Sequence, residues 1–186
     1  NGFPGQPQHP AENLDWHSAT QFCEWLNSTH HADLPTGFCA ALPSEAQWEY
    51  ACRLMKDRSG NPQAVETEYY TGDGEAALVE AGWYTENARS STQPVGQKKA
   101  TDFGLYELHG NVWEWCRDGY DADAYKRRVD GVVDPVVATG NDGHRVVRGG
   151  GWFGSPAGCR SACRIGGAPG GRIRSQGFRV CLLPVP

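Results

Sequence analysis

The sequence of 186 residues has one Met, and no stretch of it approaches the about 18 apolar residues that a membrane-spanning helix needs. It lacks a basic N-terminal segment followed by an apolar one, so we expect no secretory signal peptide in this chain. Lys-rich runs are also missing, and the sequence pI is about 5.7. These features exclude a coiled coil and a transmembrane protein, and they argue against nucleic acid as the main partner.

Close cysteine pairs are missing as well. The seven cysteines are an odd number, are widely spaced and include no Cys-x-x-Cys pair, so they cannot all pair within one chain. A structural zinc site would need tighter ligand pairs. We therefore expect reduced cysteines that pack as small core residues, which is typical of a cytoplasmic protein. A weaker alternative is a metal site at the local cluster of His30, His31 and Asp33.

What the sequence has in excess is glycine, tryptophan and an uneven charge. The 24 Gly and 7 Trp predict one loop-rich domain with short elements. Residues 145–186 contain seven Arg and neither Lys nor acid, which leaves 10 basic and 22 acidic groups in residues 1–144. We expect most of these arginines to bond to acids and to backbone carbonyls of the same chain. The alternative is a basic face turned toward a ligand.

Two helices are predicted in the first third of the chain, after an extended lead-in over residues 1–12. Asp15 can cap a helix that runs to about Leu26. Ser44 and Gln47 form a capping box for a second helix. The apolar stripes of these helices predict their buried faces: Ala19, Phe22, Cys23 and Leu26 in the first, and Trp48, Ala51, Cys52 and Met55 in the second.

The rest of the chain is predicted to be short strands and long connections. Residues 27–41 and 57–104 are expected to be mostly loop, and strands are expected over 112–116, 145–148 and 178–183. In the last strand, the alternation predicts that Phe178, Val180 and Leu182 face inward. Loops of such length are usually functional or held in place by other groups.

Several motifs between residues 13 and 180 together resemble one family. The sequence is similar to the formylglycine-generating-enzyme (sulfatase-modifying factor) domain, a variant of the C-type lectin fold. The resemblance implies an α+β domain over residues 13–186, with two helices, short antiparallel strands and long irregular loops. The matching motifs are Asn13-Leu14-Asp15-Trp16-His17-Ser18-Ala19, Leu42-Pro43-Ser44-Glu45-Ala46-Gln47-Trp48-Glu49-Tyr50-Ala51, Gly104-Leu105-Tyr106-Glu107-Leu108-His109-Gly110-Asn111-Val112-Trp113-Glu114-Trp115, Arg145-Val146-Val147-Arg148-Gly149-Gly150-Gly151-Trp152 and Gly177-Phe178-Arg179-Val180.

The enzymes of this family oxidise a substrate cysteine to formylglycine with copper held by two cysteines five positions apart. Soft thiolates suit Cu(I), and that two-coordinate site needs both of them. In this sequence the first slot is Gly154 and the second is Cys159, while Cys163 is out of register. The departure predicts that this chain is not an enzyme. A copper-dependent formylglycine-generating oxidase is the third and weakest of the functions considered.

The sequence resembles more closely the variable proteins of diversity-generating retroelements, which use the same fold. In them a C-terminal stretch is diversified at template adenines, mostly in AAC codons, between fixed residues. The stretch corresponds here to residues of about 151–176, called the variable segment below. Its fixed residues would be Trp152, Cys159, Arg160, Ser161, Ala162, Arg164, Pro169 and Arg172, followed by Gly177, Phe178 and Arg179. The variable, ligand-binding positions would be Phe153, Gly154, Ser155, Ala157, Gly158, Cys163, Ile165, Gly166, Gly167, Ala168, Gly170, Gly171, Ile173, Arg174 and Ser175.

The genetic code gives a separate check on this hypothesis. AAC codons randomised at both adenines keep their final C and cannot encode Lys, Glu, Gln, Trp or Met, and none of the fifteen positions holds one of these. At average usage this would happen about one time in thirty by chance. Gln176 breaks the pattern unless it lies outside the diversified codons. The alternative is a glycine-rich structural loop in an ordinary, non-diversified binding or regulatory module of the family.

A diversified surface must vary without unfolding the domain. We therefore expect the fixed arginines to turn inward and bond to carbonyls, and the variable side chains to project outward as one face. The larger variable groups, Phe153, Ile165, Ile173 and Arg174, would carry most of the contact. The partner would be a variable ligand such as a protein or a cell-surface molecule, and no cofactor is required.

A structural calcium ion is the one possible metal that the resemblance suggests. In relatives the region of Asn111 and Glu114 can supply oxygen ligands, which suit a hard cation. The alternative is Asn111 in a turn and Glu114 paired with an arginine of the C-terminal region. Trp113 and Trp115 fall on the opposite strand face from Glu114 and are expected to be core residues.

Overall fold

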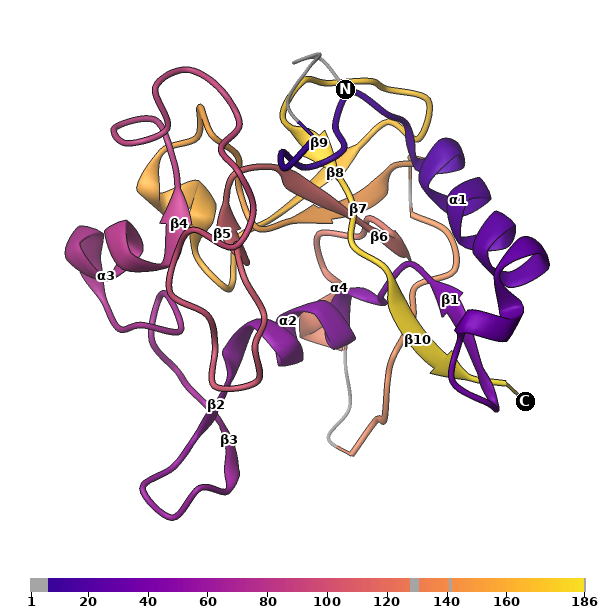
Figure 1. Ribbon diagram of the computed structural model, residues 1–186, viewed down its shortest axis with the longest axis horizontal. Coiled ribbons are helices and arrows are strands. Elements are labelled where there is room, and N and C mark those ends of the chain that lie inside the picture. The colour runs from indigo at the N-terminus through magenta and orange to yellow at the C-terminus, as the bar shows by residue number, and fades with distance from the viewer. Residues whose placement is uncertain (1–6, 128–130, 141, 186) are drawn as a thin grey trace.

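A twisted four-stranded sheet lies at the centre of the computed structural model, which describes residues 7–127, 131–140 and 142–185 (Figure 1). Its strand order is β8-β7-β6-β9, formed by Arg164–Gly167, Arg145–Arg148, Trp113–Gly119 and Gln176–Gly177. β7 runs antiparallel to both β6 and β8, whereas β9 runs parallel to β6. The two strands at the edges of the sheet, β8 and β9, thus both come from the variable segment or its end.

Helix α1 (Trp16–Thr29) packs against strand β1 (Phe38–Ala41). The Asp15 carboxylate accepts a hydrogen bond of 2.7 Å from the Ser18 amide, which satisfies one of the unpaired N–H groups of the first turn. At the other end, the Asn27 side chain bonds to both the amide and the carbonyl of Ala40. These contacts fix the helix at both ends, and the N-cap is the one predicted from the sequence.

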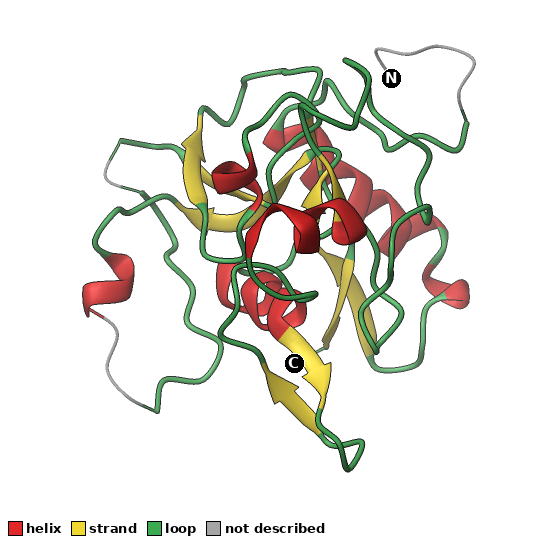
Figure 2. Ribbon diagram, turned by 90° about the vertical axis from the view of Figure 1, so that its left-hand side faces the viewer, coloured by secondary structure: helices red, strands yellow, loops and turns green. Residues whose placement is uncertain are grey.

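Helix α2 (Glu45–Arg53) begins with the predicted capping box, in which Ser44 and Gln47 satisfy each other's backbone amides. Its buried residues Trp48 and Cys52 join the core around the central sheet. Figure 2 shows the helices grouped around the strands, with long loops over much of the surface. The largest fully buried side chains include Trp48 and Trp115, so tryptophan supplies much of the interior.

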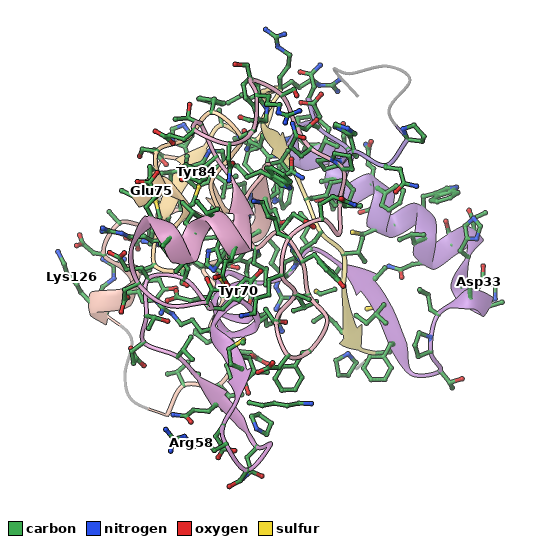
Figure 3. The ribbon with its side chains drawn as sticks, turned by 60° about the vertical axis from the view of Figure 1, so that its left-hand side comes forward. Asp33, Arg58, Tyr70, Glu75, Tyr84 and Lys126 are labelled. Carbon is green, nitrogen blue, oxygen red and sulfur yellow. The ribbon has the colours of Figure 1, made fainter. Side chains whose placement is uncertain are left out.

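Smaller elements surround this centre. Helix α3 (Gly74–Ala81) is held by a bond of 2.7 Å from the Tyr84 hydroxyl to the Glu75 carboxylate (Figure 3). No helix of the described residues is long and apolar enough to cross a membrane. The remaining elements are η1 (His31–Asp33), β2 (Leu54–Lys56), β3 (Pro62–Ala64), β4 (Gly82–Trp83), β5 (His109–Gly110), α4 (Ala124–Arg127), η2 (Pro156–Cys159) and β10 (Cys181–Pro184).

The structure corrects several sequence-based boundaries. Residues 27–41 contain the end of α1, η1 and strand β1 rather than a loop, whereas residues 57–104 are mostly loop as predicted, interrupted by β3, α3 and β4. Strand β1 was not predicted because its stability comes from pairing with β10, which is remote in the sequence. Helix α3 was not predicted because Gly72 and Gly74 look like a turn. In fact Gly74 begins the helix with Asp73 as its N-cap.

The inward face of the last strand is the opposite of the predicted one. Val180 and Leu182 are exposed, whereas Cys181 and Leu183 are half-buried. Pairing with β1 decides the face, because Cys181 lies opposite Ala41 and Leu183 lies opposite Cys39. Phe178 is half-buried as expected, but it packs beside α1, where its ring meets that of Phe22. Phe22 itself is exposed to 41%, so the first helix buries less of its predicted stripe than expected.

Candidate binding surface

Two glycines connect strand β7 to the variable segment, and no other residue could replace them easily. Gly149 and Gly150 follow β7 with φ of 94° and 81°, in the left-handed region that favours glycine. A Cβ on Gly150 would lie 2.5 Å from the Cys159 Sγ. The glycine pair therefore allows the chain to turn sharply toward η2 while Cys159 packs against the turn.

Main-chain hydrogen bonds hold the segment along its length. The Trp152 amide donates to the Asn111 carbonyl at 2.8 Å, and the Ser161 amide donates to the Glu68 carbonyl at 2.8 Å. Near the end, the Ser175 carbonyl accepts a bond of 2.7 Å from the Trp113 amide. Because these bonds use backbone atoms, they do not depend on which side chains the neighbouring positions carry.

Two of the fixed arginines turn inward, as predicted. Arg164 binds the Glu45 carboxylate through two bonds of 2.6 and 2.7 Å and also donates to the Asp121 carbonyl. Arg179 binds the Glu114 carboxylate through its Nε and through a second bond of 2.7 Å. Both pairs have the two-pronged geometry that makes arginine–carboxylate contacts strong. They connect the C-terminal region to α2 and β6.

The other two fixed arginines correct that prediction. Arg160 and Arg172 stay on the surface, with side chains 49% and 58% exposed, and they pair with Glu68 and Asp15. Exposed pairs of this kind contribute little to stability because water already solvates both charges. The arginines of residues 145–186 thus bind acidic residues of 1–144 mainly through ion pairs, as expected. Only some of these ion pairs are buried.

The four large variable side chains are all exposed. Phe153, Ile165 and Ile173 are 54%, 41% and 51% exposed, and Arg174 is also exposed. Burial of most of them would have contradicted a surface role, so the structure agrees with the expectation that they project outward. Trp152 supports this region from below, since its indole donates to the Arg174 carbonyl and its ring contacts Phe153 edge to face.

The smaller predicted positions divide into three groups. Ser175 is buried, which is a correction, because its carbonyl and side chain lie under the β6–β9 contact. Gln176 is also buried, so the residue that breaks the codon pattern lies outside the exposed set. The exposed positions are Ser155, Ala157, Gly166, Ala168 and Gly170, and the half-buried positions are Gly154, Gly158, Cys163, Gly167 and Gly171.

Gly166 and Gly167 are limited by what lies beneath them. A Cβ on Gly166 would be 2.9 Å from the Tyr120 ring, and one on Gly167 would be 2.7 Å from the Trp115 ring. Both contacts are too close for any other side chain unless the aromatic ring moves. At Gly170, by contrast, nothing lies within 4 Å of the added atom. The positions in the loops can therefore vary more freely than the end of β8.

Asn111 and Glu114 already have protein partners for the oxygens that calcium would need. Asn111 has a φ of 61°, and its side chain bonds to the amide and the carbonyl of Gln93 at 3.0 Å each. Glu114 accepts a 2.7 Å bond from the Trp48 indole in addition to the Arg179 bonds. The pairing with a C-terminal arginine is the alternative proposed from the sequence. Calcium binding stays a prediction, and it would require Glu114 to leave Arg179.

The other candidate metal ligands are not gathered into a site among the described residues. His30 and Asp33 lie 3.0 Å apart on the surface, but no group of three or more His, Cys, Asp or Glu side chains is placed to hold a metal there. Of the two residues predicted to correspond to the enzymes' thiolates, Gly154 has no side chain and Cys159 is fully buried. Burial raises the pKa of the Cys159 thiol to about 12, which keeps it protonated. All seven cysteines are free thiols.

His109 is a site residue to which the sequence analysis gave no role. Its Nδ1 lies 2.8 Å from the Cys159 carbonyl, and its Nε2 accepts a 3.1 Å bond from the Tyr70 amide. This arrangement fixes the neutral ring with the proton on Nδ1. Burial lowers its pKa to about 4. The available signal was the position of His109 within the family motif over residues 104–115, but the motif alone could not name the partners of its ring.

Comparison with known proteins gives a consistent family. Residues 1–182 match the sulfatase-modifying factor enzyme 1-like domain. The formylglycine-generating enzyme of Streptomyces coelicolor is 30% identical over 183 residues, which are 94% of this chain and 53% of that protein. The serine/threonine-protein kinase Pkn1 of Chlamydia trachomatis is 31% identical over 178 residues, or 95% and 24% of the two chains. The chain therefore spans about half or less of these relatives.

Solved structures extend the comparison. Variable protein 1 of Treponema denticola superposes with a TM-score of 0.78 at 27% identity, over 98% of this chain and 74% of that one. PvdO from Pseudomonas aeruginosa gives a TM-score of 0.69 at 27% identity, over 96% and 63%. The mixed α+β architecture is thus the C-type lectin-like fold of the formylglycine-generating-enzyme type that the sequence predicted.

Proposed function

Since this chain belongs to the family of the sulfatase-modifying factor enzyme 1-like domain, we propose that it is a ligand-binding member of that family rather than an oxidase. Its variable segment would present side chains diversified by a retroelement on a fixed C-type lectin-like scaffold. The ligand would be a protein or a cell-surface molecule. The similarity to variable protein 1 of Treponema denticola favours this branch of the family.

The observation that carries the proposal is the separation of two kinds of group within one segment. The backbone bonds and the arginines Arg164 and Arg179 hold the segment in place, while Phe153, Ile165 and Ile173 point to solvent. Exchange of the exposed groups therefore leaves the interactions that fix the loop unchanged. A binding surface that varies between copies needs this property.

The genomic neighbourhood tests the diversification directly. The DNA beside this gene should contain a near-repeat of the codons for residues 151–175, with adenines at the variable positions, and a reverse transcriptase gene. A neighbourhood without either element would contradict diversification. It would favour the second candidate, a non-diversified binding or regulatory module, which the close packing of Gly166 and Gly167 against aromatic rings supports.

The absence of oxidase chemistry is tested separately. We expect that incubation with Cu(I) and a cysteine-containing sulfatase peptide yields no aldehyde, because Gly154 offers no thiolate and the Cys159 thiol is buried. Mass spectrometry of the peptide provides the measurement, with an active formylglycine-generating enzyme as positive control. Formylglycine formed at a catalytic rate would overturn the proposal and return the chain to the enzyme branch.

A further inference from the structure

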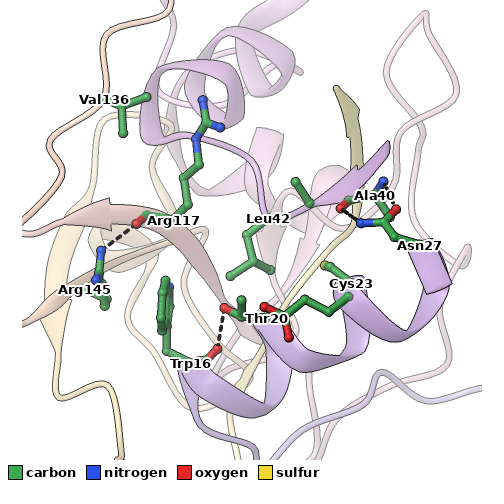
Figure 4. A pocket seen from close by; sticks show the side chains of 11 residues that line it. Trp16, Thr20, Cys23, Asn27, Ala40, Leu42, Arg117, Val136 and Arg145 are labelled. Atoms are coloured by element: carbon green, nitrogen blue, oxygen red, sulfur yellow. Dashed lines mark hydrogen bonds between the residues drawn. The ribbon is translucent and has the colours of Figure 1, made fainter. Parts of the chain in front are cut away.

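A pocket of about 470 Å³ opens between α1 and the central sheet (Figure 4). This volume is in the range of sites that hold small organic ligands. One wall is formed by α1 and the other by β1, β6 and β7, with Val136 from the loop before β7 at the side. None of the predicted variable positions lines it, so a ligand held there would occupy a different site from the one proposed above.

The walls of the pocket are largely apolar. Trp16, Cys23, Leu42 and Val136 contribute side chains, and Ala40 leaves room because its own side chain is small. The polar groups of the neighbouring Asn27 are already used in bonds to the backbone. An apolar ligand body would therefore bury carbon surface without depriving Asn27 of its hydrogen bonds.

Two arginines line this apolar pocket without a carboxylate partner in the described part of the chain. The Arg117 Nε is buried and has no hydrogen-bond partner there, and Arg117 makes no ion pair among those residues. Arg145 donates only to the carbonyls of Arg117 and Ala138, and its guanidinium lies 4.1 Å from the centre of the Trp16 ring. Figure 4 shows the bond from Arg145 to the Arg117 carbonyl at one side of the pocket.

Several other arginines of the protein do form ion pairs, whereas the exposed Arg58, Arg89 and Arg174 form none with the residues that the structure describes. Among the described residues, an aspartate or a glutamate pairs with each of five arginines of the C-terminal region: Arg148, Arg160, Arg164, Arg172 and Arg179. An unpaired buried donor such as the Arg117 Nε costs free energy. A bound anion would remove this penalty. Glu24 is the one acidic residue in the lining, and its exposure places it at the solvent side.

We propose that this pocket binds a small organic monocarboxylate with an apolar body. The carboxylate would lie at the Arg117 guanidinium, which reaches toward Val136 (Figure 4) and whose planar donors match the two carboxylate oxygens. The apolar body would lie against Trp16 and Leu42. Glu24 disfavours ligands with a second negative charge at the opening, which is why a single carboxylate fits better than a polyanion.

Calorimetric titration of the intact protein with octanoate tests the proposal. Octan-1-ol and octylamine have the same apolar chain with a neutral or a positive head, so they serve as matched ligands. We expect saturable binding of octanoate at one site and at least about tenfold weaker binding of the other two, since each lacks the charged bonds. Equal binding of all three would mean non-specific contact with apolar surface and would overturn the proposal.

Variants locate the site. Arg117→Gln should weaken octanoate binding by at least about tenfold. Arg58→Gln removes one exposed arginine that lies outside both the pocket and the variable segment, and it should leave the affinity unchanged. Because Arg117 makes no hydrogen bond or ion pair through its side chain in the described part of the chain, its replacement should not unfold the domain, which circular dichroism would verify. Unchanged affinity of Arg117→Gln, or equal loss in both variants, would contradict the assignment of this pocket.

Discussion

Strand β6 and the variable segment belong to the same sheet but use their side chains in opposite ways. In β6, Glu114, Trp115, Cys116 and Asp118 are all buried, on both faces of the strand. In the variable segment, the larger side chains at the predicted variable positions are exposed, and the inward bonds come from the backbone and from arginines outside those positions. One region therefore defines the fold through its side chains, and the other keeps its path almost independently of them.

This difference shows how a domain can separate stability from recognition. A buried tryptophan or ion pair has many neighbours that would have to move if it changed. An exposed isoleucine has few such neighbours, so a different residue at its position costs little. Substitutions in the two regions should therefore differ in their effect on the free energy of unfolding, from several kcal/mol in the core to almost none on the surface. Each substitution is measured by urea unfolding at fixed protein concentration unless another measurement is named.

Trp115→Ala should destabilise the protein most, by about 3 to 5 kcal/mol, because the removed ring leaves a cavity in the core. The side chain is fully buried beside Val147 and Ala40. Trp25→Ala offers a matched change of the same size on the exposed side of α1, where the ring is 47% exposed. If the two variants lose equal stability, the contrast between a fixed interior and a tolerant surface does not hold.

Arg179→Ala should cost about 2 to 3 kcal/mol, since it leaves the buried Glu114 carboxylate without its charged partner. Arg160→Ala is the matched change within the same region, and it removes an ion pair that is half exposed. We expect a loss of less than about 1 kcal/mol for it. A loss at Arg160 as large as that at Arg179 would show that burial does not decide the role of these arginines.

Stability should also fall in acid because of His109. Its pKa is about 4 in the folded protein against an ordinary value of 6.5, so the unfolded chain binds the proton more readily. The contribution is complete above about pH 7 and is lost as the pH falls through 6.5 toward 4, by about 3 kcal/mol. His109→Gln should flatten this part of the pH profile. His17→Gln, a change at an exposed histidine, is the matched control variant.

Ile165→Ser and Ile173→Ser should change stability by no more than about 0.5 kcal/mol each, the usual range for surface positions. Gly170→Ser should behave in the same way, because no atom lies near its Cβ direction. Gly167→Ser should cost more than these three, since it would meet the Trp115 ring. Losses at both isoleucines comparable to that of Trp115→Ala would mean that the segment is core, and the diversified-surface hypothesis would then be dropped.

Local chemistry was sufficient for several features of the fold. The caps at Asp15 and Ser44 were predicted because each depends on groups within three residues of it. Strand β7 was predicted with its observed bounds, Arg145–Arg148. Strand β1 and the inward face of β10 could not be predicted in this way, because each depends on the other strand over a long sequence separation. The same limit explains why Arg160 and Arg172 were expected to lie inside.

The candidate surface was predictable as a segment but not as a set of exposed residues. The alternation of small residues with arginines indicated where the surface would lie, and Phe153, Ile165 and Ile173 are exposed there. Ser175 is buried because β9 pairs with β6, a contact between remote parts of the chain. The pocket with Arg117 and Arg145 gave no sequence signal, since its walls come from distant elements.

The sequence by itself determined the family, the two capped helices and the loop-rich α+β class. These depend on local hydrogen bonding, on residue periodicity and on motifs that are contiguous in the chain. Only the tertiary structure decided which arginine meets which carboxylate, which glycines lie against aromatic rings and where a pocket remains. Those features depend on groups tens of residues apart, such as Glu45 and Arg164, whose distance is set by the packing of the whole domain.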